Sequence, residues 1–281
     1  MKNTVDIETL LKEYANKSSI RDVRRLIAHA KKISYEDVFF HGSEQFLSPE
    51  EHACFLDMLG RYGKNEPISK IINRKSFWKH DFFVNENVLD PRPETELIIE
   101  AVLRHFDPES QLSFLDLGTG SGCILLSLLY EFKKSTGIGI DISPKALEVA
   151  VRNRQVLGIS GAAFLEASWN HPLDLTPASC DVIVSNPPYI KTQDLAQLDE
   201  NIRKYDPPEA LDGGASGLDA YLQIAQVSKK FLKKNGRIFL EVGYDQADDV
   251  ARILAASGYE GIRREKDLQA LDRVVCAFGG W

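Results

Sequence analysis

The tetrapeptide Asn186-Pro187-Pro188-Tyr189 follows an apolar segment at 181–184 and carries groups suited to one kind of chemistry. An amide or aromatic amine nitrogen is a poor nucleophile because its lone pair is delocalised, so its two N–H groups must be held while it faces an electrophile in line. The Asn186 side-chain carbonyl and the Pro187 backbone carbonyl can each accept a hydrogen bond from one of these N–H groups. The prolines stiffen the turn, and Tyr189 can stack on the flat group. By itself, Pro-Pro would indicate only a turn after a strand.

A second motif, Asp116-Leu117-Gly118-Thr119-Gly120-Ser121-Gly122, lies between an apolar segment and a helical pattern. Glycines let a ligand approach the backbone, and a helix start offers free N–H groups. A dinucleotide fingerprint would need glycine at 123, where this chain has cysteine. The motif instead resembles motif I of the class I S-adenosylmethionine-dependent methyltransferases. A nicotinamide enzyme and a purely structural turn remain alternatives.

Asp141 lies 23 residues after Gly118, at the end of the next apolar segment. A carboxylate at such a strand end can accept hydrogen bonds from both ribose hydroxyls of a bound nucleoside. The alternative is that Asp141 caps the helix expected to begin at Pro144. Its position and spacing favour the ribose role.

These motifs require a framework of alternating strands and helices. Alternation with short turns predicts a doubly wound, parallel α/β sheet, in which ligands bind at the carboxyl ends of the strands. The predicted strands are 113–117, 137–140, 163–165, 181–184, 237–242 and 273–278, and the clearest predicted helices are 144–157, 218–232 and 247–256.

The first part of the chain follows a different pattern. Apolar residues at helical spacing predict a small N-terminal helical bundle, including a helix that Ser48 and Glu51 would start with a capping box and Gly60 would end. Aromatic and apolar residues then predict a β-hairpin within 75–90. We therefore expect a helical substrate-docking domain at 1–74, a β-hairpin linker at 75–90 and an S-adenosylmethionine-dependent methyltransferase domain at 91–281.

The composition excludes several classes of protein. The net charge of the 281 residues is −7, and the first 90 residues carry 14 basic and 14 acidic side chains, so the excess acid follows them. This balance argues against a broad grip on nucleic acid. The four cysteines form no C-x-x-C pair, and no apolar run approaches the roughly 20 residues of a membrane span. The N-terminal residues lack an apolar signal core, and we expect a cytoplasmic protein.

The chain as a whole resembles the HemK/PrmC type of N5-glutamine methyltransferases, which modify class-1 peptide chain release factors. The Asn-Pro-Pro-Tyr tetrapeptide is similar to that of enzymes that methylate adenine, cytosine or glutamine nitrogen. The resemblance also rests on Glu66-Pro67-Ile68, Phe77-Trp78, the 91–96 run Pro-Arg-Pro-Glu-Thr-Glu and the 272–275 run Asp-Arg-Val-Val. It implies a mostly parallel seven-stranded sheet.

The resemblance also implies site residues. Catalytic roles fall on Asn186, Pro187 and Tyr189, and substrate contacts on the whole tetrapeptide including Pro188. Trp169 stands where the family has an aromatic residue near the adenine, although Ala167-Ser168 lacks the usual acid unless Glu166 substitutes for it. The implied cofactor contacts are Gly118, Thr119, Gly120, Ser121, Gly122, Asp141, Trp169 and Asn186.

The function implied is methyl transfer from S-adenosylmethionine to the side-chain amide of a glutamine in a Gly-Gly-Gln loop of a class-1 release factor, by a monomeric enzyme that needs no metal. An N6-adenine methyltransferase acting on DNA or RNA, a glutamine methyltransferase of a ribosomal protein, and a non-catalytic binding module are the alternatives. An enzyme for adenine would have to hold an extruded base, and neither stable nucleic acid binding nor membrane association is expected.

Overall fold

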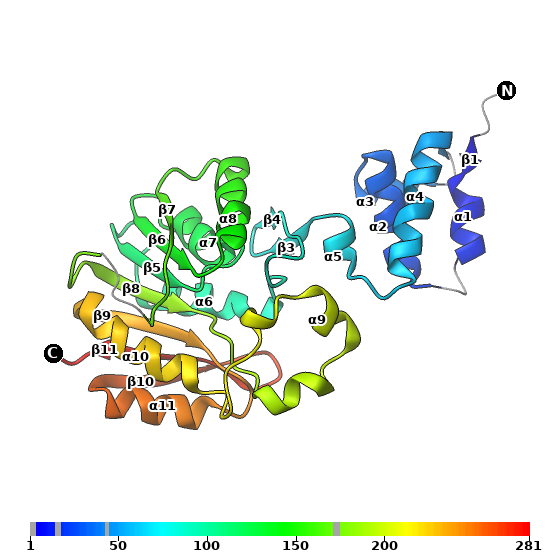
Figure 1. Ribbon diagram of the computed structural model, residues 1–281. Helices are drawn as coiled ribbons and strands as arrows, with labels where there is room; N and C mark the ends of the chain where they lie inside the picture. The colour runs from blue at the N-terminus through cyan, green and yellow to red at the C-terminus, as the bar shows by residue number, and fades with distance from the viewer. Residues whose placement is uncertain (1–3, 15–17, 43–44, 171–174) are drawn as a thin grey trace. The chain divides into compact units, whose positions relative to one another are not determined.

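The computed structural model describes residues 4–14, 18–42, 45–170 and 175–281. It divides into two compact units, Met1–Arg74 and Lys75–Trp281 (Figure 1). Within the described ranges, none of the helices is both long enough and apolar enough to cross a bilayer.

The first unit is helical, with one small antiparallel sheet. A single apolar core, which includes Ile7, Leu26, Ile27 and Phe55, holds it together. Its elements are β1 (Val5–Asp6), α1 (Ile7–Tyr14), α2 (Ile20–Lys31), α3 (Tyr35–His41), β2 (Phe46–Leu47), α4 (Pro49–Tyr62) and α5 (Ile68–Ile71).

Helix α4 begins as the sequence predicts and ends later. Ser48 accepts a hydrogen bond from the Glu51 amide at 3.2 Å, and the Glu51 carboxylate accepts one from the Ser48 amide at 2.8 Å, which completes the capping box. The prediction that Gly60 ends the helix is wrong, since α4 continues to Tyr62. A glycine inside a helix is disfavoured by only about 1 kcal/mol, which the neighbouring turns tolerate.

The second unit begins with the predicted hairpin and continues into a seven-stranded sheet. In the hairpin, β3 (Lys75–Phe77) pairs antiparallel with β4 (His80–Phe82). The strand order of the sheet is β10-β11-β9-β8-β5-β6-β7. Its strands are β5 (Ser113–Leu117), β6 (Thr136–Asp141), β7 (Ala162–Glu166), β8 (Cys180–Ser185), β9 (Leu232–Glu241), β10 (Tyr259–Lys266) and β11 (Asp272–Gly279).

Five strands run parallel, and the last two pair antiparallel at one edge. The predicted doubly wound, mostly parallel sheet is therefore confirmed. The helices and short 3₁₀ turns of this unit are η2 (Pro93–Thr95), α6 (Glu96–His105), α7 (Cys123–Glu131), α8 (Pro144–Leu157), η3 (Thr192–Gln197), α9 (Glu200–Tyr205), η4 (Pro208–Ala210), α10 (Asp219–Phe231) and α11 (Ala247–Ala256).

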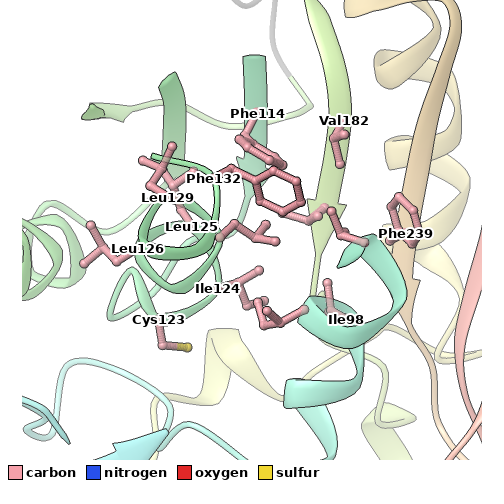
Figure 2. Close-up of a cluster of buried hydrophobic side chains, with 14 of the residues drawn as sticks. Ile98, Phe114, Cys123, Ile124, Leu125, Leu126, Leu129, Phe132, Val182 and Phe239 are labelled. Carbon is pink, nitrogen blue, oxygen red and sulfur yellow. The ribbon is translucent and has the colours of Figure 1, made fainter. Parts of the chain in front are cut away.

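The two faces of the sheet pack against different helices because successive side chains of a strand point to opposite faces. One face meets α6 and α7, and Figure 2 shows Phe114, Val182 and Phe239 from the strands beside Ile98 and Ile124 from these helices. On the other face, the alternate strand residues pack against α10 and α11.

Edge strand β10 was absent from the sequence prediction. Its eight residues include five with charged side chains, and most of the strand is exposed. An edge strand with one solvated face carries few apolar residues, so the alternation that identifies buried strands is lost.

Candidate active site

The motifs lie together at the carboxyl edge of the sheet. The glycine turn follows β5, Asp141 ends β6, and the Asn-Pro-Pro-Tyr tetrapeptide follows β8. Strands β5 and β8 are direct neighbours, and the buried Ser185 hydroxyl donates to the Leu117 carbonyl at 2.6 Å. This bond joins the last residues of both strands, so the tetrapeptide and the glycine turn start side by side.

The glycine turn adopts backbone angles that favour glycine. Gly118, Gly120 and Gly122 have φ values of 75°, 53° and 78°. A Cβ added at Gly120 would meet nothing within 4 Å, so this glycine faces open space in which a ligand can approach the backbone. The side chains of Thr119 and Ser121 are buried, which leaves their backbone groups as the means of contact with a ligand.

Strand β6 holds this turn in place. Its Ile140 carbonyl accepts hydrogen bonds from the amides of Gly118 and Thr119, both at 2.9 Å. The Thr119 hydroxyl donates to the buried Asp116 carboxylate at 2.6 Å. The turn is therefore fixed by neighbouring strands before any ligand arrives.

Asp141 links the glycine turn to the start of α8. Its carboxylate accepts a hydrogen bond from the Gly120 amide and another from the Ser143 amide, each at 2.9 Å. The residue that caps α8 is Ser143, whose hydroxyl accepts from the Ala146 amide at 3.2 Å. Burial raises the pKa of Asp141, while the backbone hydrogen bonds oppose that rise. Asp141 is thus free of the helix-capping role and stands beside the open glycine.

Trp169 follows β7 and packs over the glycine turn. A Cβ on Gly118 would lie 3.1 Å from the Trp169 ring, so the ring needs a glycine at this position. The indole Nε1 donates to the Gln223 side chain of α10 at 2.9 Å. Glu166, the residue that could replace the missing acid, ends β7 and is exposed.

The tetrapeptide has one buried and three half-buried residues, Pro187 being the buried one. Asn186 Nδ2 donates to the Thr95 hydroxyl at 3.2 Å. Tyr189 packs partly against the core on the α10 side, and burial raises the pKa of its phenol. Its backbone carbonyl accepts from Gln246 Nε2 at 3.0 Å.

The long segment that follows the tetrapeptide returns to it. The Ile190 amide donates to the Leu211 carbonyl at 3.0 Å, and the Gly213 amide donates to the Ile190 carbonyl at 2.8 Å. A Cβ on Gly213 would lie 2.7 Å from the Tyr189 Cα, so the two backbones touch directly. Within this segment, the buried Asp206 also forms an ion pair with Arg92 at 2.9 Å. These contacts hold the segment against the tetrapeptide.

Two buried carboxylates lie at this edge of the sheet. Burial raises the pKa of Asp116, in the glycine motif, to about 7. Burial likewise raises the pKa of Glu241, the last residue of β9, to about 7, with the Thr95 hydrogen bond opposing the rise. Both groups therefore gain a proton more readily in the folded than in the unfolded chain.

These shifts predict how stability depends on pH. A carboxyl group whose pKa is raised by folding stabilises the fold below its unfolded pKa, and that contribution is lost as the pH rises through the folded value. We expect the melting temperature to fall between about pH 4 and about pH 8, by about 2–4 °C for each kcal/mol lost. In Glu241→Gln the decline should be smaller, and differential scanning fluorimetry across this range measures it. A decline of equal size in both proteins would contradict the assignment to Glu241.

Three contributors to this site were missed in the sequence. Thr95, Glu241 and Gln246 contact or support the tetrapeptide, although they lie far from it along the chain. Glu241 left a signal as a single acid within the apolar run 238–242, and Thr95 lies in the 91–96 run on which the family resemblance partly rests. Gln246 lies in ordinary polar surroundings, and only the fold brings it to the site.

Comparison with known proteins gives two family matches. Residues 80–259 match a family described as a methyltransferase domain, and residues 6–72 match one described as the PrmC N-terminal domain. A methyltransferase from Pyrococcus furiosus has a similar fold, with a TM-score of 0.53 and 17% identity over 80% of this chain and 99% of that one.

Curated relatives are similar over most of the chain. One, a release factor glutamine methyltransferase from Caulobacter vibrioides, is 45% identical over 230 residues, which cover 82% of this chain and 79% of the relative. Another of the same name, from Cereibacter sphaeroides, is 40% identical over 257 residues, or 92% of this chain and 90% of the relative.

Proposed function

The chain belongs to the release factor glutamine methyltransferase family, and from this premise we propose that it methylates the N5 amide nitrogen of the glutamine in the Gly-Gly-Gln loop of a class-1 peptide chain release factor. The observation that carries the proposal is the placement of Asn186-Pro187 directly beside the glycine turn, through the Ser185–Leu117 hydrogen bond. This proximity supports methyl transfer from a cofactor bound at the glycine turn to an amide bound at the tetrapeptide.

The residues of the glycine turn fit S-adenosylmethionine as the methyl donor. Gly120 faces open space, Asp141 lies beside it with a carboxylate suited to ribose hydroxyls, and Trp169 supplies an aromatic face over Gly118. When bound, the cofactor supplies a methyl group on a positively charged sulfur, which is already a strong electrophile.

The protein contributes mainly positioning to the reaction. The Asn186 Oδ1 and the Pro187 carbonyl accept hydrogen bonds from the two N–H groups of the glutamine amide and hold its nitrogen in line for attack. The prolines fix these acceptors in advance, and Tyr189 stacks on the planar amide. The amide becomes acidic as it is methylated and loses its proton to water, so we assign no general base.

The experiment that tests this function is a labelling assay. The protein is incubated with methyl-labelled S-adenosylmethionine and with intact release factor, a ribosomal protein fraction or duplex DNA in separate reactions. We expect label on the release factor, at the glutamine of its Gly-Gly-Gln loop. Label on adenine or on a ribosomal protein would instead support one of the alternative substrates.

Cofactor binding is tested separately at Asp141. We expect Asp141→Ala to weaken binding of S-adenosylhomocysteine by about 1–3 kcal/mol, because a charge-assisted hydrogen bond is lost. Asp141→Asn is the matched variant, since its side-chain carbonyl still accepts from the Gly120 amide, and it should lose less. Calorimetric titration measures both, and wild-type affinity in Asp141→Ala would exclude the ribose role.

We further propose that the enzyme acts in the cytoplasm as a monomer and forms no stable complex with nucleic acid. The net charge of −7 supports the last point, because backbone binding needs many basic side chains on one face. Light scattering after size-exclusion chromatography and a DNA-binding titration at low salt test the monomer and the absence of binding.

A further inference from the structure

A chain of three buried or half-buried side chains leads from the tetrapeptide into the protein. Asn186 Nδ2 donates to the Thr95 oxygen at 3.2 Å. The Thr95 hydroxyl in turn lowers the pKa of the Glu241 carboxyl, as a hydrogen-bond donor to its ionised form does. Thr95 and Glu241 are each only 2% exposed. Water therefore has little access to replace either partner.

The direction of these hydrogen bonds follows from the donors available. A hydroxyl has one hydrogen to donate, and an ionised carboxylate can only accept. In its ionised form, above a pKa of about 7, Glu241 accepts the hydrogen bond from Thr95, and the Thr95 oxygen can then serve residue 186 only as an acceptor. Residue 186 must then present a donor to Thr95, which turns the Asn186 amino group inward and leaves Oδ1 for the substrate.

We propose that Thr95 and Glu241 are positioning residues for methyl transfer, which fix the orientation of the Asn186 amide and make asparagine, rather than aspartate, the residue required at position 186. This inference rests on the proposed function for its kinetic part. Its structural part, the direction of the hydrogen bonds, is independent of the substrate.

A structural role alone explains Glu241 poorly. Its Oε2 atom is buried and has no hydrogen-bond partner among the described residues, an arrangement that destabilises a fold. An apolar residue would suit position 241 better, because it directly follows the buried apolar residues Ile238, Phe239 and Leu240. Acceptance of a hydrogen bond from the Thr95 hydroxyl would explain why a carboxylate occupies this position.

Charged and titratable groups from several elements surround this carboxylate. Glu94 raises its pKa, and Arg273 and Arg92 lower it. The charge of Glu241 in turn raises the pKa of the phenols of Tyr189 and Tyr221. The neighbours therefore include two permanent cations and one further acid. A pH experiment must leave these neighbouring groups unchanged. Comparing proteins that differ only at position 241 meets this condition.

The first test removes the Thr95 hydroxyl. We expect Thr95→Val, which keeps the shape, to reduce the single-turnover methylation rate by about tenfold to a hundredfold, since Asn186 loses its fixed orientation. Affinity for S-adenosylhomocysteine should not change. Thr95→Ser restores the hydroxyl and should recover most of the rate. Ser127→Ala, which removes a buried hydroxyl of α7, is the control and should not change the rate.

The second test reverses the hydrogen-bond chain. At a pH well above 7, where both carboxylates of Asn186→Asp are ionised, they compete for a hydrogen bond from the single Thr95 hydroxyl, and we expect the rate to fall at least as far as in Thr95→Val. Adding Glu241→Gln relieves the competition, because the glutamine can donate to Thr95 and Thr95 can then donate to the new carboxylate at position 186. The double variant should therefore be faster than Asn186→Asp by about tenfold. Asn235→Asp, at an exposed position of β9, controls for the added charge.

A readout without substrate separates this inference from the proposed function. Two neighbouring carboxylates raise each other's pKa on folding, and the stability linked to that rise is lost as the pH increases. Relative to wild type, the melting temperature of Asn186→Asp should fall between about pH 4 and about pH 8, and the double variant should lack this extra fall. If wild type methylates no release factor while this difference is present, the proposed function fails and the hydrogen-bond chain stands. Asn186→Asp as fast and as stable as wild type across this range would overturn the inference.

Discussion

Asn186→Ala is expected to reduce the single-turnover rate of methyl transfer at saturating cofactor by roughly 10²-fold or more, while the fold persists. The substitution removes the acceptor that holds one hydrogen of the substrate amide, and positioning contacts of this kind carry much of the rate in such a reaction. The Pro187 carbonyl remains, but one acceptor cannot fix the rotation of a planar amide. Rates at saturating cofactor, with quantified release factor, measure the effect.

The control for this experiment is the melting temperature with and without S-adenosylhomocysteine. Asn186 is half-buried, and its side chain bonds to the Thr95 hydroxyl at the margin of the sheet rather than within it, so its loss should leave the sheet intact. Unchanged stabilisation by the ligand would place the defect in transfer. An alanine variant that transfers methyl as fast as wild type would remove Asn186 from the mechanism.

Deleting residues 1–74 is expected to reduce methylation of the intact release factor by about 10²–10⁴-fold. We propose that the first unit docks the protein substrate on a second surface. Two linked contacts bind more tightly than either alone by a factor of this order, and the deletion removes that gain. The first unit has its own apolar core, separate from those of Lys75–Trp281, so the deletion leaves the cores of the catalytic unit unbroken.

A short peptide that contains Gly-Gly-Gln is the matched substrate for this test. The full chain and the truncated chain should methylate the peptide at similar rates, because a peptide is too small to use a second docking surface. Circular dichroism and S-adenosylhomocysteine binding establish that the truncated chain is folded. Equal rates on the intact release factor would show that the first unit is not a docking element.

Aspartate at position 186 illustrates how the structure changes an expectation. From the sequence alone, a carboxylate there should retain part of the activity, because it still accepts a hydrogen bond. The Thr95–Glu241 pair adds a second requirement, a donor that faces inward. A single sequence shows which groups residue 186 can offer, whereas the direction of its neighbours' hydrogen bonds depends on the fold.

The sequence by itself determined six of the seven strands of the sheet and the order of its motifs. Buried parallel strands are short, continuous apolar runs; the glycine turn and the Asn-Pro-Pro-Tyr tetrapeptide directly follow two of them, and Asp141 ends a third. Because parallel strands place their carboxyl ends at one edge, local patterns were enough to predict that these motifs lie close together. The helix start at Ser48 was equally readable, since a capping box is formed by residues three apart.

Only the tertiary structure decided how the site is held. Edge strand β10 is mostly charged and exposed, so its place in the sheet depends on pairing with β11 rather than on its own pattern. Thr95, Gln246 and Glu241 reach the tetrapeptide across 91, 57 and 55 residues of chain respectively, the first two by hydrogen bonds and the last through Thr95. Contacts at such separations leave no local periodicity, because they are created when distant elements pack and not by the residues next to them.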